Sequence, residues 1–542
     1  MEEEDTKADH WKNVIVMSDA GKPIFWRFGN DEEILTTCGL ISALMASASG
    51  LGDMQYLRSK SLSLVFMTVG AISLVAIAKK NSSEDEEGEQ LLMKLQLEYL
   101  YGQIIFTLTQ QVQTILIQNP NYDIGQIIGA SETVMRGMLN DSGAEGERVA
   151  SYLTGAIEVV GPIAKDLREK TSLTLLEICN ETPNTVFAIL LVGEKLLSLV
   201  QPSYLPHQLH PSDLRILIKF ITCQPGLFTS CELWSPICLP RFNASGFLYA
   251  YSSCLHERTK LSLVLVSQMN ETTQFDLFRQ ASTKIRKELG LPLAVGSVLK
   301  IGVDERTNDT DVAWKRLDDD SSVDGDSADA SKVRTSSRGV ANAHQDPLLS
   351  EILDAIDLEN FSELVDEYMG IGKVLHFVFR KDVQVSGHTN KECGQLPQCF
   401  SPPLDFADAK SKRRVWSIYQ KLCLRMRLGS ATTEVTWDGY NEMLEANLSG
   451  VDHETDVPLI HPSSSAVAQA LTESIPKTNG ITYMVDGKEL FLAMNGKGFE
   501  LYAVFSASIL ITQATSSAAL LARTLVADSG KLFLMEPLTW KD

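Results

Sequence analysis

The sequence predicts an α+β fold, with mixed α/β character, built from three copies of one strands–helix–strands–helix unit. Two strand patterns around a short turn open the chain and lead into a helix, and this order returns at 185–222 and again from 373 onward. A single hairpin cannot bury a core alone, so each hairpin must belong to a larger unit. At 542 residues the chain is also too long for one ordinary core. We therefore expect three sheets, each with helices on both faces.

The first copy begins near the amino terminus. One strand pattern ends at Ser18, Asp19–Pro23 forms the turn, and Ile24–Phe28 is the second strand. A helix is expected from about 31 to 49, strands at 62–69 and 72–79, and helices from about 90 to 179. The stretch 62–78 carries no charge, but Gly70 stands at its centre between β-branched runs. This pattern favours two strands around a tight turn over a membrane span.

The second copy opens with a hairpin at 185–202 that turns at Gly193-Glu194. Its first helix is expected to begin at His210-Pro211, because proline is tolerated in the first helical turn. Strands are expected at 236–241, 246–254 and 261–267, and a helix at 274–289.

The third copy follows the polar stretch 304–346. We expect a short helix at 347–366, a strand within 373–385 and a helix at 407–428. Strands should follow at 481–486, 488–494 and 499–505, then a helix at 508–527 and a last strand at 531–537. The uncharged stretch 501–522 contains Thr512 and Gln513 among other polar residues, which argues against a membrane span.

These patterns divide the chain into five segments. They are an acidic tail (1–10), a first unit with a helical extension (11–180), a second unit (181–303), a disordered acidic linker (304–346) and a third unit (347–542) with a loop-rich insertion (428–478). The linker is expected to be disordered because Asp, Ser and Ala dominate it and apolar residues are too sparse to offset chain entropy.

Composition excludes several classes of function. The 48 Lys and Arg against 69 Asp and Glu give a net charge of −21, which disfavours general nucleic-acid binding because that needs a positive surface. The nine cysteines form no C-x-x-C pair, and the acidic amino terminus has no apolar secretory segment. We expect reduced thiols and a cytoplasmic location.

Catalytic motifs are nearly absent. There is no P-loop, H-E-x-x-H or G-x-S-x-G, and Gly370-Ile371-Gly372 lacks the third glycine of a dinucleotide-binding fingerprint. His207 and His210 are spaced for a metal site or for packing at a helix start. We expect no catalytic residue, metal or cofactor, and a protein that acts by contact.

Two helices have surfaces that suggest binding. In the helix at 31–49, Ile34, Cys38, Ile41 and Met45 can face the sheet, while Leu40, Leu44 and Leu51 form a second apolar side. A helix that is apolar nearly all round is buried on both sides, against a neighbouring domain of the same chain or against a partner.

The helix at 407–428 combines an apolar stripe with a basic face. The stripe consists of Val415, Ile418, Tyr419, Leu422 and Met426, and Arg414, Lys421 and Arg425 line the basic face. This face is either simply solvated or attracted to anionic phosphoinositide membranes.

Three stretches carry a resemblance to a known family. "VIVMSDAGKPIFWRFGNDEE" at the start, "HPSDLRILIKFI" with "WSPICLPRFNASGFLYAYSSCL" and "LSLVLVS" at 210–267, and "LFLMEPLTW" at the end are similar to the SAND family, the Mon subunits of the Mon–Ccz vacuolar fusion complex. The resemblance implies three tandem longin domains, each a five-stranded, mostly antiparallel sheet between helices.

The resemblance also implies a function. Together with a Ccz-type longin partner, the Mon subunit is a guanine-nucleotide exchange factor for the late-endosomal Rab GTPase, acting in endosome maturation, vacuole or lysosome fusion and autophagosome delivery. An early-endosomal Rab is a further candidate partner, as recruiter. The chain would be cytoplasmic and peripheral on endosomal and vacuolar membranes. The alternative is a longin-type scaffold or tether without exchange activity.

Longin pairs meet through the first helix and the adjacent strand, so the resemblance implies three groups of site residues. For the partner interface these are Ile24, Leu40, Leu44 and Leu51. For the GTPase contact they are Phe25, Arg27 and Glu33. Contact with phosphoinositide membranes would involve Arg414, Lys421 and Arg425, and no nucleic acid is expected.

Overall fold

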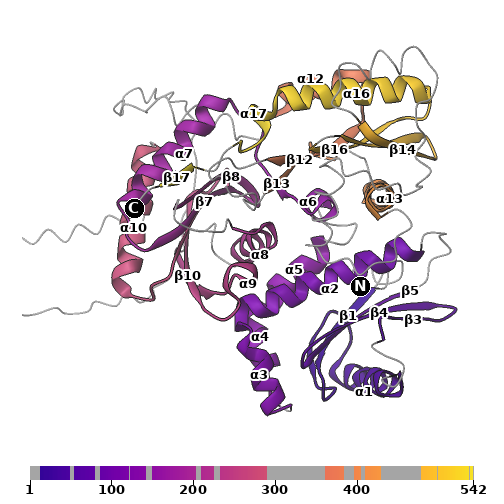
Figure 1. Ribbon diagram of the computed structural model, residues 1–542, viewed down its shortest axis with the longest axis vertical. Helices are drawn as coiled ribbons and strands as arrows, with labels where there is room; N and C mark the ends of the chain where they lie inside the picture. Colours follow the sequence, from indigo (N-terminus) through magenta and orange to yellow (C-terminus); the bar gives the residue numbers. More distant parts are fainter. Residues whose placement is uncertain are drawn as a thin grey trace, which may run out of the picture.

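The computed structural model describes most of the three expected units. The described residues are 12–48, 54–79, 86–120, 122–141, 149–202, 209–224, 232–289, 361–383, 396–404, 409–428, 478–496, 498–535 and 538–540. They contain three β-sheets that lie within one body, with helices α2 and α8 between them (Figure 1). The expected linker (304–346) and nearly all of the expected insertion lie outside the described residues.

The first sheet is antiparallel and has the strand order β2-β1-β5-β4-β3. Its strands are β1 (Lys12–Ser18), β2 (Pro23–Trp26), β3 (Tyr56–Arg58), β4 (Leu62–Val69) and β5 (Ile72–Lys79). Helix α1 (Asp31–Ala48) covers one face. The other face is covered by α2 (Glu86–Leu108), α3 (Gln111–Gln118), α4 (Gly125–Ile128), the 3-10 turn η3 (Gly129–Ser131) and α5 (Glu132–Asp141).

The second sheet repeats this order as β8-β7-β11-β10-β9. Its strands are β7 (Thr185–Val192), β8 (Lys195–Pro202), β9 (Glu232–Ile237), β10 (Leu248–His256) and β11 (Leu261–Ser267). The helices of this unit are α7 (Lys165–Asn180), α8 (Pro211–Thr222), α9 (Pro240–Asn243) and α10 (Thr272–Glu288).

The third sheet has the order β14-β15-β16-β12-β13. Its strands are β12 (His376–Val383), β13 (Leu396–Phe400), β14 (Thr478–Asp486), β15 (Glu489–Gly496) and β16 (Phe499–Ser506). Its helices are α12 (Phe361–Gly370), α13 (Ala409–Leu428), α16 (Ile511–Ala527) and α17 (Ser529–Leu532), with the 3-10 turn η4 (Ile371–Lys373) after α12.

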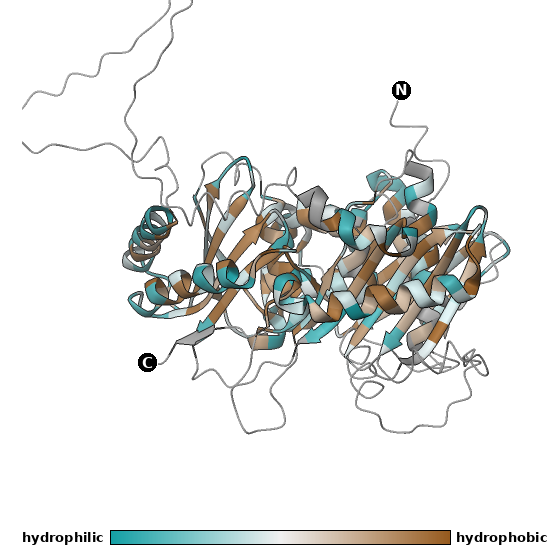
Figure 2. Cartoon of the chain, turned by 90° about the horizontal axis from the view of Figure 1, so that it is seen from above, coloured by the Kyte–Doolittle hydropathy of each residue, from teal (hydrophilic) through white to brown (hydrophobic). Residues whose placement is uncertain are grey.

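All three sheets have the same topology. Numbered within each unit, the strands lie in the order second, first, fifth, fourth, third, and a helix connects the second strand to the third. The predicted α+β fold with a repeated unit is therefore confirmed. Figure 2 shows strands that are mostly brown (apolar) and helices on which brown and teal residues alternate, as expected of sheets between amphipathic helices.

Two short strands join sheets that are built mainly by other parts of the chain. Strand β6 (Ile157–Glu158), which follows α6 (Val149–Thr154), pairs in parallel with β13 of the third sheet. Strand β17 (Leu538–Trp540) pairs in parallel with β8 of the second sheet. Each added strand occupies the same edge, beside the second strand of its unit.

Local patterns located most elements but missed several short ones. The predictions at 62–69, 72–79 and 261–267 match β4, β5 and β11, and the uncharged stretch 62–78 is a hairpin. Strands β3, β6 and β13 were not predicted. The strand predicted at 531–537 was wrong, because Ser529–Leu532 is helical and β17 begins only at Leu538. None of the helices in the described ranges is long and apolar enough to cross a membrane.

Candidate protein-interaction surface

Helix α1 is started by its own sequence. Asn30 precedes the helix, and its Oδ1 accepts a hydrogen bond from the Glu33 backbone N–H at 2.9 Å, while Glu33 Oε2 accepts one from the Asn30 N–H at 3.5 Å. This reciprocal pair satisfies two donors that a helix start leaves free. Asp31, Glu32 and Glu33 lie in the first turn, where negative charge favours the helix dipole.

The inner face of α1 packs on the first sheet. Ile34, Cys38 and Ile41 are buried against side chains of β1, β4 and β5, and the partly buried Met45 joins them, as the spacing predicted. Burial raises the pKa of the Cys38 thiol to about 11, so this cysteine stays protonated at neutral pH and contributes as an apolar core residue.

The outer face of α1 is apolar and exposed. Leu35, Leu40 and Leu44 are 57%, 63% and 38% exposed, and no charged residue occurs from Ile34 to Ala48. A helix face in permanent contact with water normally carries charged side chains. An exposed apolar face of this kind marks a surface for another protein. We call the exposed residues Leu35, Thr36, Gly39, Leu40, Ala43, Leu44 and Ser47 the α1 outer face.

The structure agrees with only part of the predicted partner interface. Leu40 and Leu44 belong to the α1 outer face, and Leu51 lies outside the described residues. Ile24 is buried instead, with Ile124 and Ile128, because α4 packs over β2. These residues belong to a cluster of buried apolar side chains that includes residues of all three sheets, which we call the main core. Ile24 is therefore withdrawn as a partner contact. Leu35 was missed, although the absence of charge in 34–48 could have indicated it.

The expected GTPase contacts also divide. Phe25 is buried in the same core, with the Arg136 guanidinium 5.8 Å from its ring centroid. The expectation that Phe25 lies on the surface was therefore wrong. Both faces of β2 are covered, and a strand with both faces covered has no outward side chain. Arg27 is half-buried and donates from Nη2 to Asn140 Oδ1 at 3.0 Å. Glu33 is exposed but also serves in the cap of α1.

Arg136 closes the outer edge of β2. Its Nη1 donates to the Arg27 carbonyl at 2.6 Å and its Nη2 to the Trp26 carbonyl at 3.4 Å. A side chain bound to edge carbonyls blocks the addition of a foreign strand. The edge of the first sheet at β2 is therefore closed to strand addition.

The basic face of α13 is partly neutralised within the chain. Arg414 forms ion pairs with Asp486, at 2.9 Å, and with Glu489, and these tie α13 to the β14–β15 turn. Its bond to Glu489 is the main cause that raises the pKa of Arg414. Arg414 thus has a structural role, and its predicted membrane role stays a prediction. Lys421 is partly exposed, and the Arg425 side chain lies outside the described residues.

The expected apolar stripe of α13 packs into a buried apolar cluster with residues of β12, β15 and β16, which we call the third core. Val415, Ile418, Tyr419 and Leu422 are buried there, and Met426 packs against them in part. The prediction for this stripe is confirmed.

His210 has a structural role at the start of α8. Its Nδ1 accepts a hydrogen bond from the Ser212 backbone N–H at 3.2 Å, which is the helix-start alternative of the two considered; His207 lies outside the described residues. Within the part of the chain that the structure describes, no group of three or more His, Cys, Asp or Glu side chains is placed to hold a metal ion.

Comparison with known proteins agrees with this architecture. Residues 12–137 match the family model "First Longin domain of FUZ, MON1 and HPS1", and residues 183–284 match "Second Longin domain of FUZ, MON1 and HPS1". The two matched regions contain the first and second sheets, and the third sheet repeats their strand order.

Several curated proteins are similar to the chain. "Vacuolar fusion protein MON1 homolog A" of Gallus gallus is 34% identical over 294 residues, which are 53% of this chain and 51% of that protein. "Protein SAND" of Takifugu rubripes is 31% identical over 290 residues, 52% of each chain. "Vacuolar fusion protein MON1 homolog" of Oryza sativa subsp. japonica is 31% identical over 269 residues, 49% of this chain and 44% of that protein. The chain spans about half the length of these relatives. With its tandem longin domains, the chain is similar to proteins of the MON1/SAND family.

Proposed function

We propose that this chain is one subunit of a heterodimeric guanine-nucleotide exchange factor for a late-endosomal Rab GTPase. It would act in endosome maturation, fusion with vacuoles or lysosomes, and delivery from autophagosomes. Its relatives are named vacuolar fusion proteins, which supports the trafficking role. The α1 outer face is the main support for a partner subunit, because it is an exposed, uncharged helix surface on the first longin domain.

The partner in this proposal is a Ccz-type longin subunit that docks on the α1 outer face. Gly39 and Ala43 lie one turn apart on this face, and nothing stands within 4 Å of where a Cβ on Gly39 would be. Small residues let a partner helix approach closely, while Leu40 and Leu44 supply apolar area. The acidic first turn of α1 (Asp31, Glu32, Glu33) calls for basic side chains at the facing end of the partner.

Exchange requires no covalent chemistry from this chain. The complex must bind the nucleotide-free GTPase more tightly than the nucleotide-bound form, which it achieves by displacing the switch segment that orders magnesium and phosphates. Arg27 and Glu33, which lie near the amino-terminal end of α1, are our candidates for the GTPase contact. Peripheral attachment to phosphoinositide membranes, with an early-endosomal Rab as recruiter, belongs to the same proposal.

The partner surface is tested with a double substitution. In the variant Leu40→Asp with Leu44→Asp, both exposed positions tolerate carboxylates in the free chain, so the fold should persist. In a complex each carboxylate would be buried without a counter-charge, at a cost of several kcal/mol. The affinity for the Ccz-type partner should fall at least about a hundredfold, which corresponds to about 2.7 kcal/mol. The variant should therefore co-purify poorly with that partner.

A matched control separates charge from position. Gln280→Asp with Thr283→Asp places the same two charges on exposed positions of α10, and it should bind the partner normally. Wild-type yield of the complex with the α1 variant would disprove the interface. Release of a fluorescent GDP analogue from the Rab, measured with and without the partner, then distinguishes exchange from a scaffold or tether, which would give a stable complex and no release.

A further inference from the structure

The peptide connection between the second and third units is not their main physical link. The described chain stops at residue 289 and resumes at 361. Yet β6, from the amino-terminal part, lies in the third sheet, and β17, from the carboxyl terminus, lies in the second. We propose that these two exchanged segments hold residues 12–289 and 361–540 together as one body that persists when the intervening chain is cut.

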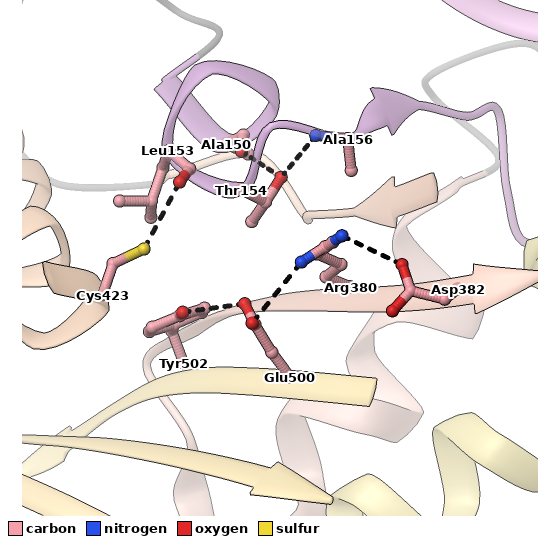
Figure 3. A network of polar contacts seen from close by, with 9 residues as sticks. All are labelled: Ala150, Leu153, Thr154, Ala156, Arg380, Asp382, Cys423, Glu500 and Tyr502. Atoms are coloured by element: carbon pink, nitrogen blue, oxygen red, sulfur yellow. Dashed lines mark hydrogen bonds and ion pairs between the residues drawn. The ribbon is translucent and has the colours of Figure 1, made fainter. Parts of the chain in front are cut away.

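Helix α6, which begins the first exchanged segment (residues 149–160), packs into the third core. Ala150 and Leu153 are buried in one cluster with Tyr419 and Cys423, and the Cys423 thiol donates to the Leu153 carbonyl at 3.4 Å (Figure 3). Figure 3 shows this segment lying over the strands of the third sheet. The buried surface of α6 therefore belongs to the carboxyl-terminal half, although α6 precedes the second unit in sequence.

Residues 157–160 then cross from one sheet to the other. The Val159 N–H donates to the Cys399 carbonyl of β13 at 3.1 Å, and the next residue, Val160, donates to the Leu196 carbonyl of β8 at 3.0 Å. Val159 also forms a parallel bridge with Leu196. Two consecutive residues are thus bonded to two different sheets.

A row of polar residues runs across the third sheet to this crossing. Glu500, Arg380, Cys399 and Glu158 are direct neighbours across β16, β12, β13 and β6. Arg380 pairs with Glu500 at 3.5 Å and with Asp382 at 3.0 Å (Figure 3). Glu158 pairs with Lys195 of β8 at 2.8 Å. A shift of β6 along β13 would move Glu158 away from Lys195, and the nearly buried Glu158 carboxylate would lose its ion pair.

The second exchanged segment is the carboxyl-terminal strap, residues 528–540. Leu532 and Phe533 are buried in the main core. The Gln398 side chain binds the strap on the third unit, with Nε2 donating to the Leu534 carbonyl and Oε1 accepting from the Leu534 N–H, both at 2.8 Å. The strap then reaches the second unit, where β17 pairs with β8.

Arg168 of α7 joins the strap to the crossing segment and to β8. Its buried guanidinium donates to the carbonyls of Val160 at 2.5 Å, Lys531 at 3.1 Å and Leu197 at 3.2 Å. These three carbonyls come from the crossing segment, the strap and β8. Ile163 adds a bond from its N–H to the Lys531 carbonyl at 2.9 Å. One side chain therefore bridges segments 363 residues apart in sequence.

The proposal is tested on the full chain with one cut. A recognition sequence for a site-specific protease is inserted within 304–346, and the purified protein is cleaved and analysed by size-exclusion chromatography and by denaturing gel. We expect both fragments in a single peak at the position of the uncut chain, with the melting temperature lowered by no more than a few degrees. Separate peaks under native conditions would overturn the proposal.

A variant then asks whether the exchanged segments are responsible. Arg168→Met with Gln398→Ala removes the side-chain bonds to the strap, and the uncut variant serves as a check that the chain still folds. After cleavage its fragments should dissociate at least about tenfold faster than those of the wild type. The matched control, Lys170→Met with Gln280→Ala, changes one exposed residue on α7 and one on α10. It should leave the dissociation rate unchanged. Equal rates for variant and control would show that other contacts hold the halves together.

Discussion

At the scale of single residues, Gly39 shows how a local weakness can serve a surface. It lies in the middle of α1, where glycine costs helix stability because the unfolded chain loses more freedom there. The surroundings do not require glycine, since a Cβ would meet nothing within 4 Å. At Gly70, in contrast, φ is +57° and the Gln113 side chain occupies the space of a Cβ. Gly39 is therefore best explained by what approaches α1 from outside.

Gly39→Ala should stabilise α1 in the isolated chain. We expect a gain of about 0.5–1 kcal/mol in local stability, which slows amide hydrogen exchange in α1 about two- to fivefold. Gly70→Ala is the contrasting variant and should destabilise the β4–β5 turn, because its φ disfavours a side chain. Unchanged or faster exchange in α1 of Gly39→Ala would mean that a tertiary contact not seen in the structure depends on this glycine.

His376 illustrates how burial makes an element sensitive to acid. It lies in β12, fully enclosed, with Nε2 3.1 Å from the Pro402 carbonyl and Nδ1 3.1 Å from the Tyr419 hydroxyl. Loss of hydration disfavours the imidazolium and lowers the pKa of His376 to about 3, even though its bond to the Pro402 carbonyl acts in the opposite direction. The neutral imidazole therefore belongs to the folded third sheet.

Acidification should destabilise the third sheet through His376. In the unfolded chain His376 has a pKa near 6.5. The stability that the buried neutral imidazole gives the folded state is therefore complete above that pH and is lost as the pH falls toward 3. Between pH 6.5 and pH 5 the loss is about 2 kcal/mol. Hydrogen exchange of β12 at several pH values measures it. His376→Gln should flatten this pH dependence, and a slope equal to that of the wild type would contradict the assignment.

At the scale of elements, α13 combines two roles that its sequence does not separate. One side packs into the third core, and Arg414 fastens the helix to the β14–β15 turn. Arg414 and Lys421 of the predicted membrane face are both partly exposed, but Arg414 is held in ion pairs with Asp486 and Glu489. We therefore expect Lys421 to contribute more than Arg414 to a membrane contact.

Lys421→Glu should weaken binding to anionic liposomes by about tenfold or more at low salt, because each basic residue near such a surface contributes about 1 kcal/mol. The fold should be unaffected. Lys170→Glu on α7 carries the same charge change on another unit and should bind normally. Binding of Lys421→Glu equal to that of the wild type in co-sedimentation would identify the basic face as simply solvated. Arg414→Glu is unsuitable for this test, because it places three carboxylates together.

At the scale of the whole molecule, the three longin-type sheets differ at one edge. The second strand of the second sheet is covered by β17, that of the third sheet by β6, and β2 of the first sheet by Arg136 and α4. The first unit thus closes this edge without borrowing a strand, and it presents the α1 outer face to solvent. This difference is consistent with the proposed partner site on the first unit.

Deletion of residues 536–542 should loosen the second sheet at this edge. Loss of β17 leaves backbone groups of β8 without their parallel partner. We expect faster hydrogen exchange in β8 and α7, which both contact β17, and unchanged exchange in β1 of the first sheet. Equal protection of β8 in the truncated and complete chains would show that β17 contributes nothing to stability.

The sequence by itself determined the repeated unit, most of its helices and strands, and the resemblance to the MON1/SAND family. Hairpins such as β4–β5 and β7–β8 follow from apolar runs around glycine turns, and the inner faces of α1 and α13 follow from helical spacing, because these signals arise within a few residues. Tertiary structure alone decided the pairing of β6 and β17, the strand β13, the burial of Ile24 and Phe25, and the ion pairs of Arg414. Short strands such as Ile157–Glu158 have no periodic pattern and form only because a distant strand supplies their hydrogen bonds. A charged residue likewise shows its role only when the fold brings its partners to it.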